Sequence, residues 1–174
     1  MNDVKLYDPN FAEQTINTWL LLRQTWIAVN KVAETKLAKI GLTPEKAAVL
    51  WACRDFPGTL TPAEIARLLF RENQTIAGLL NRMEKDGLVT RVPKRRGHPF
   101  TEIRITDKGK EKCGPCIEIY KNVILGFSSD MPAGEREHFE KTLRKLILKM
   151  LDNMHIEAGR YPCDEGNKPL KVNW

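Results

Sequence analysis

The sequence has no long hydrophobic run: no stretch of its 174 residues approaches the roughly 18 consecutive apolar residues that a transmembrane helix needs. Its first residues, MNDVKLYDPNF, also lack the basic segment followed by an apolar one that marks a signal peptide. These two absences predict a cytoplasmic protein with no membrane partner.

Histidine is scarce, and the three that occur, His98, His138 and His155, are scattered along the chain. None has a His or Cys partner at the spacing of a zinc site. No Ser/His/Asp set, paired carboxylates or glycine-rich phosphate loop stands out. The sequence therefore predicts no catalytic residues, no metal site and no cofactor, and the protein is not expected to be an enzyme.

The four cysteines, Cys53, Cys113, Cys116 and Cys163, do not form a disulfide scaffold in a cytosolic chain of this length. Residues 113–116, Cys-Gly-Pro-Cys, reproduce the motif of thioredoxin-like oxidoreductases, but they lie in a helical run without the strand–helix–strand pattern of those enzymes. Beside plain buried thiols, three readings stay open. They are a thiol–disulfide oxidoreductase, a redox switch through Cys113 and Cys116, and half of a zinc site completed by Cys163 or a second subunit.

Residues 60–69 carry the signals of a short helix. Thr61 is a good N-cap, Glu64 follows three residues later as in a capping box, and Pro62 occupies the first helical position. A turn at residues 70–72 precedes a second helix, for which Asn73 is the expected cap and Gly87 the stop signal.

The second helix has two contrasting faces. Its apolar residues are Ile76, Leu79, Leu80 and Met83. Helical geometry therefore predicts that the small and polar residues opposite are exposed, namely Gln74, Ala77, Gly78 and Asn81. Two short helices joined by a tight turn, the second with such a face, indicate a helix-turn-helix.

A hairpin is predicted next, from strands at 88–92 and 100–105, where Ile103 and Ile105 alternate with Glu102 and Arg104. Its tip, residues 93–99, contains Lys94, Arg95 and Arg96 in succession, followed by His98. Such a tip suits phosphates or a minor groove. Together these elements predict a winged helix-turn-helix.

The net charge of +6, from 28 basic and 22 acidic residues, is concentrated in the same region. Residues 82–112 contain ten lysines and arginines against five acidic residues, a surplus of five positive charges. Because this surplus coincides with the predicted wing, it favours a nucleic-acid partner.

Helices are expected on both sides of this module. Residues 10–40 read as one long helix with more apolar surface, including Trp19 and Trp26, than a single small core would use. Residues 107–157 read as two further helices, the first kinked or broken at Pro115. The expected division is 10–40 and 107–157 for dimerisation, 42–106 for the winged helix-turn-helix, and 158–174 for a C-terminal tail.

The motifs in this order resemble the multiple-antibiotic-resistance regulator (MarR) family. They are Leu-Thr-Pro-Ala-Glu-Ile-Ala at 60–66, Leu-Leu-Asn-Arg-Met-Glu-Lys-Asp-Gly-Leu-Val at 79–89, Lys-Arg-Arg at 94–96 and Ile-Thr-Asp-Lys-Gly at 105–109. The resemblance implies a mainly α fold in which N- and C-terminal helices join two copies into a homodimeric bacterial transcription regulator. It also implies a small aromatic or anionic effector, for which Trp19, Trp26 and Trp51 are the candidate residues.

Two positions depart from the family pattern. The wing has Lys94 where the family usually has an aspartate before its two arginines, and Gly78 stands where an arginine is frequent. Both differences concern which operator is read.

The predicted function is that of a repressor that binds a pseudo-palindromic double-stranded operator and is released by a small molecule. Gln and Asn side chains suit adenine edges in the major groove, whereas arginines and lysines suit phosphates and the minor groove. The predicted DNA-binding residues are Arg71, Asn73, Gln74, Thr75, Ala77, Gly78, Asn81, Arg82, Arg91, Lys94, Arg95, Arg96 and His98.

Overall fold

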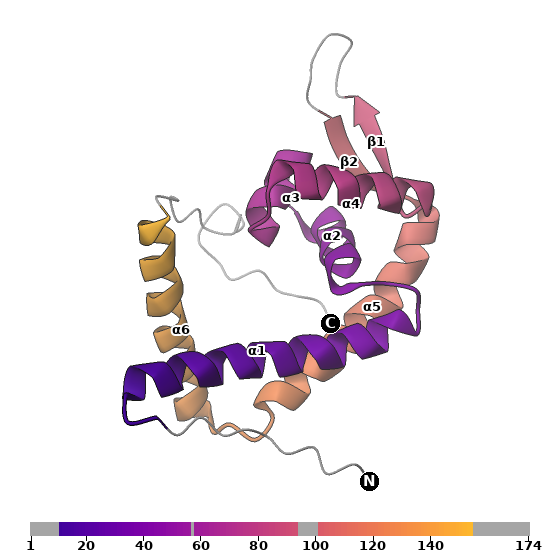
Figure 1. The fold of residues 1–174 in the computed structure, drawn as a ribbon. Helices are drawn as coiled ribbons and strands as arrows, with labels where there is room; N and C mark the ends of the chain where they lie inside the picture. The colour runs from indigo at the N-terminus through magenta and orange to yellow at the C-terminus, as the bar shows by residue number, and fades with distance from the viewer. Residues whose placement is uncertain (1–10, 57, 94–100, 155–174) are drawn as a thin grey trace.

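A computed structural model describes residues 11–56, 58–93 and 101–154 of the chain. In that part it is mainly helical with one small antiparallel sheet, as predicted (Figure 1). The elements in chain order are α1 (Gln14–Ala38), α2 (Pro44–Asp55), α3 (Pro62–Leu69), α4 (Asn73–Lys85), β1 (Val89–Pro93), β2 (Thr101–Ile105), α5 (Asp107–Ser128) and α6 (Ala133–Asn153).

The winged helix-turn-helix is built from α2, α3, α4 and the hairpin around one apolar core. The largest fully buried side chains of this core include Leu50, Ile65, Ile76, Leu80 and Met83. They come from the three helices, and the apolar face predicted for α4 is confirmed.

The hairpin is joined to this core through its backbone. Val89 pairs with Ile105 and Pro93 with Thr101 in the antiparallel register. The backbone N–H of Ile103 also donates to the carbonyl of Leu60 at 2.8 Å, which ties β2 to the segment preceding α3.

Three helices begin at a threonine that caps them. The hydroxyls of Thr43, Thr61 and Thr106 each accept a hydrogen bond from the backbone N–H three residues later, at 3.3, 3.2 and 3.1 Å. Each bond satisfies a backbone donor that the helix itself leaves unpaired, which is worth about 1 kcal/mol. The predicted cap at Thr61 is confirmed.

Asn73 does not cap α4, contrary to expectation. The N-cap is Glu72, which makes no side-chain capping bond, and Asn73 is the first helical residue. The turn occupies residues 70–72 as predicted, α4 begins one residue earlier than expected, and Phe70 in the turn has a left-handed backbone conformation.

Pro115 does not break α5, which is assigned as one helix from Asp107 to Ser128. A proline removes the hydrogen bond to the carbonyl four residues earlier, here that of Glu111. Both Pro115 and Glu111 are exposed, so water can reach the carbonyl that the proline leaves unpaired.

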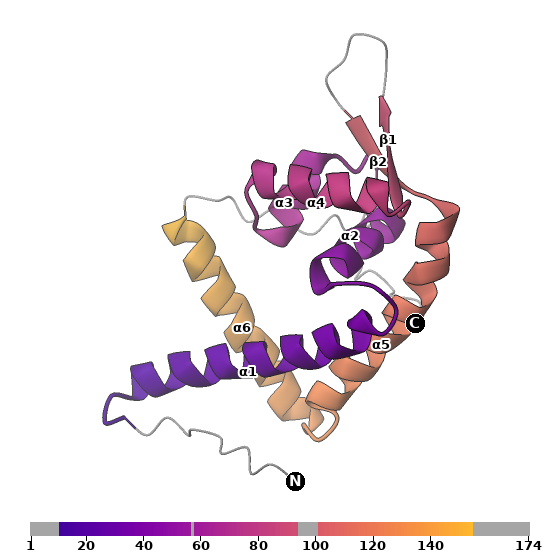
Figure 2. The same ribbon diagram turned by 45° about the vertical axis from the view of Figure 1, so that its right-hand side comes forward.

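The flanking helices form a separate layer. α1 packs along α5, and α6 leaves the end of α5 and crosses α1 in both views (Figures 1 and 2). Much of their apolar surface stays exposed in the single chain, including Trp19, Trp26, Leu125, Ile147 and Met150. No described helix combines the length and apolar character that membrane crossing requires.

The two layers meet closely at Gly109, in the first turn of α5. A Cβ atom at this position would collide with the carbonyl oxygen of Leu88 and would lie 2.7 Å from Cγ1 of Ile105. The absence of a side chain therefore allows the start of α5 to rest directly on the start of β1.

We expect Gly109→Ala to lower the free energy of unfolding by about 1–3 kcal/mol, because the methyl group has no space and the backbone must shift. Gly78→Ala in α4 is the matched control. Its nearest neighbour would be Nη1 of Arg82 at 3.7 Å, so it should raise the same free energy by about 0.5–1 kcal/mol. Urea unfolding at one fixed protein concentration measures both, and equal stability of the two variants would contradict the close approach.

Candidate nucleic-acid interface

The outer face of α4 carries the predicted reading residues. Gln74, Ala77 and Asn81 are exposed and Gly78 is half-buried, while the opposite side of the helix lies in the core. A surface of small and polar side chains lets a helix backbone approach the floor of a groove while amides meet base edges.

Exposed polar residues continue this face towards the start of the helix. Arg71, Asn73 and Thr75 are exposed, and Arg82 is exposed near the other end. The Arg82 guanidinium lies one turn beyond Gly78, with Nη1 3.7 Å from the point that a Cβ of Gly78 would occupy. A positive charge therefore lies close to the position where the related family often has an arginine.

Arg91 is engaged within the module. Its Nη1 lies 2.7 Å from Oε2 of Glu84, its backbone N–H donates to Oε1 of Glu84 at 3.2 Å, and its Nη2 donates to the carbonyl of Ala77 at 3.4 Å. These contacts tie β1 to α4. A phosphate contact by Arg91 stays a prediction, and its charge is balanced by Glu84 in the described structure.

The tip of the wing lies outside the described residues. Lys94, Arg95, Arg96 and His98, four of the predicted DNA contacts, fall in this segment. The strands on either side, β1 and β2, are described and form a paired hairpin.

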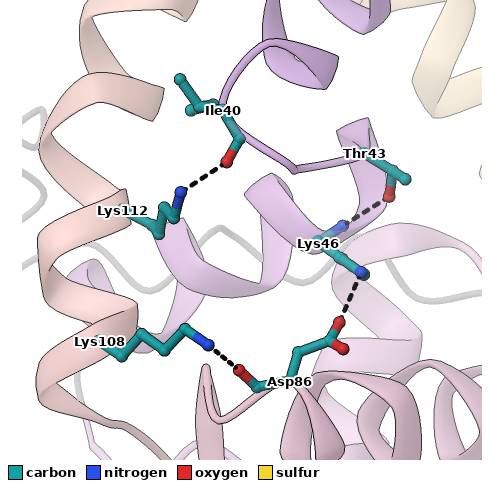
Figure 3. A network of polar contacts seen from close by, with 6 residues as sticks. All are labelled: Ile40, Thr43, Lys46, Asp86, Lys108 and Lys112. Carbon is teal, nitrogen blue, oxygen red and sulfur yellow. Dashed lines mark hydrogen bonds and ion pairs between the residues drawn. The ribbon is translucent and has the colours of Figure 1, made fainter.

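The far end of α4 is fixed by lysines from two other helices (Figure 3). Nζ of Lys46 in α2 lies 2.7 Å from Oδ2 of Asp86, the C-cap residue of α4, and Nζ of Lys108 in α5 donates to the Asp86 carbonyl at 2.8 Å. One turn along α5, Nζ of Lys112 donates to the carbonyl of Ile40, between α1 and α2, at 2.8 Å.

Asp86 needs these partners because a carboxylate at a helix C-terminus faces the negative end of the helix dipole. The hydrogen bond from Lys46 lowers the pKa of Asp86, which keeps the carboxylate charged and the contact in place. Lysines from α2 and α5 thus hold the orientation of α4.

The three tryptophans proposed for an effector differ in their surroundings. Trp19 and Trp26 lie on α1 with 62% and 66% of their surfaces exposed. Trp51, on α2, is half-buried: its ring meets Tyr120 of α5 edge-on at 5.9 Å between centroids, and Cζ of Arg54 lies 5.8 Å from its ring centre.

The described cysteines Cys53, Cys113 and Cys116 carry free thiols, and the latter two are buried in α5. Burial raises the pKa of Cys53 and of Cys116 to about 12 and also raises that of Cys113. A raised pKa keeps a thiol protonated and therefore a poor nucleophile. Cys163 lies outside the described residues, and within them no group of three or more His, Cys, Asp or Glu side chains is placed to hold a metal ion.

Phe70, in the turn between α3 and α4, is a feature that the sequence analysis did not single out. Its backbone is left-handed, with φ 50° and ψ 49°, and it is the one non-glycine residue with positive φ in the described part of the chain. Such a conformation costs about 1–2 kcal/mol for a residue with a side chain. The sequence did contain one signal for this feature. A large apolar residue stands at the end of a predicted helix, where Gly or Asn is usual.

Comparisons with known proteins agree with this geometry. The family model of the MarR family matches residues 40–98, from the end of α1 to the wing. The transcriptional activatory protein BadR of Rhodopseudomonas palustris is 31% identical over 120 residues, which is 66% of this chain. The chain spans 65% of the length of that relative.

Two solved structures share the fold. The organohalide-sensing transcriptional regulator RdhR, bound to 2,4-dichlorophenol, has a TM-score of 0.74 at 24% identity, covering 88% of this chain and 92% of that one. The Staphylococcus aureus MepR–DNA complex has a TM-score of 0.72 at 21% identity, covering 80% and 99%. At these identities the two structures establish the fold alone.

Proposed function

We propose that this chain, which belongs to the MarR family of transcription regulators, works as a homodimer that binds a pseudo-palindromic DNA operator and responds to a small aromatic molecule. The observation that carries the proposal is the outer face of α4. It presents amides and small residues between Arg71 and Arg82, while its inner face is anchored in the core.

The reading roles follow from chemistry. Gln74 and Asn81 carry amides that match adenine edges in the major groove, and Ala77 and Gly78 leave room for the helix to approach. Arg71 and Arg82 suit phosphates on the groove walls. The wing residues 94–96 remain the proposed minor-groove contact on the strength of their sequence.

Dimerisation is supported by the apolar surface of the outer layer. Exposed apolar patches of this extent on a soluble protein mark a contact with another protein. We propose that a second copy of the chain covers this apolar surface, because the resemblance to the MarR family implies that the terminal helices of two copies pair. A two-fold dimer predicts operator half-sites separated by one helical turn, about 10 base pairs, or a multiple of it.

An aromatic effector is proposed at the junction of α1, α2 and α5. Trp51 and Tyr120 offer ring surfaces, and the guanidinium of Arg54 beside Trp51 is already paired with the carboxylate of Asp55. The two rings suit an aromatic ligand such as a phenol. The dichlorophenol bound by RdhR is a molecule of that kind.

The direction of regulation is a separate question. Repression was predicted from the family resemblance, whereas BadR is described as an activator. We keep repression as the proposal, and a promoter fusion in cells with and without the protein tests it: higher reporter output in the presence of the protein would reject it.

The cysteine alternatives receive less support. A redox switch or an oxidoreductase needs a reactive thiolate, whereas burial raises the pKa of Cys113 and Cys116. The Cys-Gly-Pro-Cys segment also lies in the interior of α5 and not at the start of a helix.

Gln74→Ala should change which base is preferred at one operator position while leaving the salt dependence of binding unaltered, because an amide is lost and no phosphate contact is. Arg71→Ala is the contrasting variant. It should weaken binding to all sequences alike and reduce the slope of log K against log salt by roughly one unit. Fluorescence anisotropy on a set of duplexes at several salt concentrations measures both effects, and a uniform loss for Gln74→Ala would contradict its role as a reader.

Trp26→Glu should convert the dimer into single chains, because it places a charge in the proposed apolar interface. Ala63→Glu, on the exposed side of α3, adds the same charge elsewhere and should leave the dimer intact. Sedimentation velocity reports the mass of each variant and circular dichroism its helix content. A Trp26→Glu protein that still sediments as two chains would remove the α1 surface from the interface.

A panel of aromatic acids and phenols should contain a compound that raises the melting temperature by about 5–10 °C at one hundred times its dissociation constant. Trp51→Ala should reduce that shift in melting temperature, because Trp51 on α2 is a proposed ligand contact. Trp19→Ala tests whether α1 also contributes to binding. An absence of any shift across the panel would count against the effector.

A further inference from the structure

Phe70 combines an unfavourable backbone conformation with an exposed ring. It is 56% exposed, and it is the one large apolar side chain that the described part of residues 33–123 leaves open to solvent. All other exposed large apolar side chains in the described residues belong to the outer layer of α1, α5 and α6 or to the segments at its ends. The packing of the module therefore does not account for an aromatic residue here.

Backbone hydrogen bonds fix the turn that carries this ring. The N–H of Phe70 donates to the carbonyl of Arg67 at 3.3 Å, and the N–H of Arg71 donates to the carbonyl of Ala66 at 3.0 Å. These bonds end α3 at a residue with a left-handed backbone conformation. Glycine is ordinarily favoured at such a position. The ring is thus presented on a rigid turn.

The turn lies directly before the proposed reading helix. α4 begins at Asn73, three residues after Phe70. In a helix-turn-helix the first residues of the second helix approach the base edges. Phe70 is next to Arg71, the proposed phosphate contact, and four residues before Gln74, the proposed amide reader.

We infer that Phe70 is an apolar, specificity-determining DNA contact that packs against the C5-methyl group of a thymine in each half-site. This inference rests on the proposed function. The thymine methyl is the apolar group that the major groove presents, and phenylalanine is one of the side chains that contact it. An apolar contact of this kind gives the large ring a role at a position where it strains the backbone.

The test uses the full chain and the duplex that wild-type protein selects from a random-sequence library. Replacing each thymine in turn by deoxyuridine removes one methyl group and nothing else. Substitution at one symmetry-related pair of base positions should weaken binding of wild-type protein about fivefold. These positions should be the ones that lie against the N-terminal end of α4, next to Phe70.

Two variants, Phe70→Gly and Phe70→Asn, remove the ring and accept the left-handed backbone. Each should bind the unmodified duplex about fivefold more weakly and be insensitive to deoxyuridine at that pair, with an unchanged salt slope. Thermal melting checks that both variants fold, and the scan with wild-type protein stands without them.

The outcomes separate the inference from the function on which it rests. Failure of wild-type protein to select any duplex would overturn the proposed function. Selection of a duplex with no position sensitive to deoxyuridine, or variants that bind as tightly as wild type, would overturn the role of Phe70 alone. A reduced salt slope in the variants would also overturn it, because that result indicates a lost phosphate contact.

Discussion

The structure depends on the junction at which α4 ends and α5 begins. Three consecutive carbonyls, those of Asp86, Gly87 and Leu88, accept hydrogen bonds from Nζ of Lys108, Oγ1 of Thr106 and the N–H of Thr106, respectively. The acceptors are backbone atoms, so the orientation of α4 relative to α5 is set independently of the side chains on its outer face. That face is therefore open to substitution without disturbing the frame that presents it.

The same junction relates the two layers of the molecule. α5 contacts the end of α4 through Lys108 and the α1–α2 connection through Lys112, one turn apart on one helix. A displacement of α5 relative to α1 would therefore act on both contacts together. This arrangement offers a physical route by which an event between the outer helices reaches α4.

The sequence was sufficient for the elements whose signals are local. Threonine caps, apolar periodicity and the alternating strand identified the winged helix-turn-helix and the exposed face of α4, because each depends on residues a few positions apart. The sequence marks Phe70 as unusual at the end of a helix but does not indicate its backbone conformation, and the Glu84–Arg91 pair and the close approach at Gly109 were not predictable. They depend on where distant segments meet, or on tertiary contacts that overrule a residue's own preference. Pro115 belongs with them, since its effect on α5 depends on which side of the helix faces water.

The two exposed tryptophans of α1 affect which copies of the chain can pair in the proposed dimer. Trp19 and Trp26 are seven residues apart, so they project from nearly the same side of the helix, and each ring is large and rigid. Recognition through such rings depends on shape complementarity more than on charge. In the proposed dimer, a change in either ring after a gene duplication would separate the two copies into distinct pairing populations. The two copies would then form no mixed dimers, while the winged helix-turn-helix stayed the same.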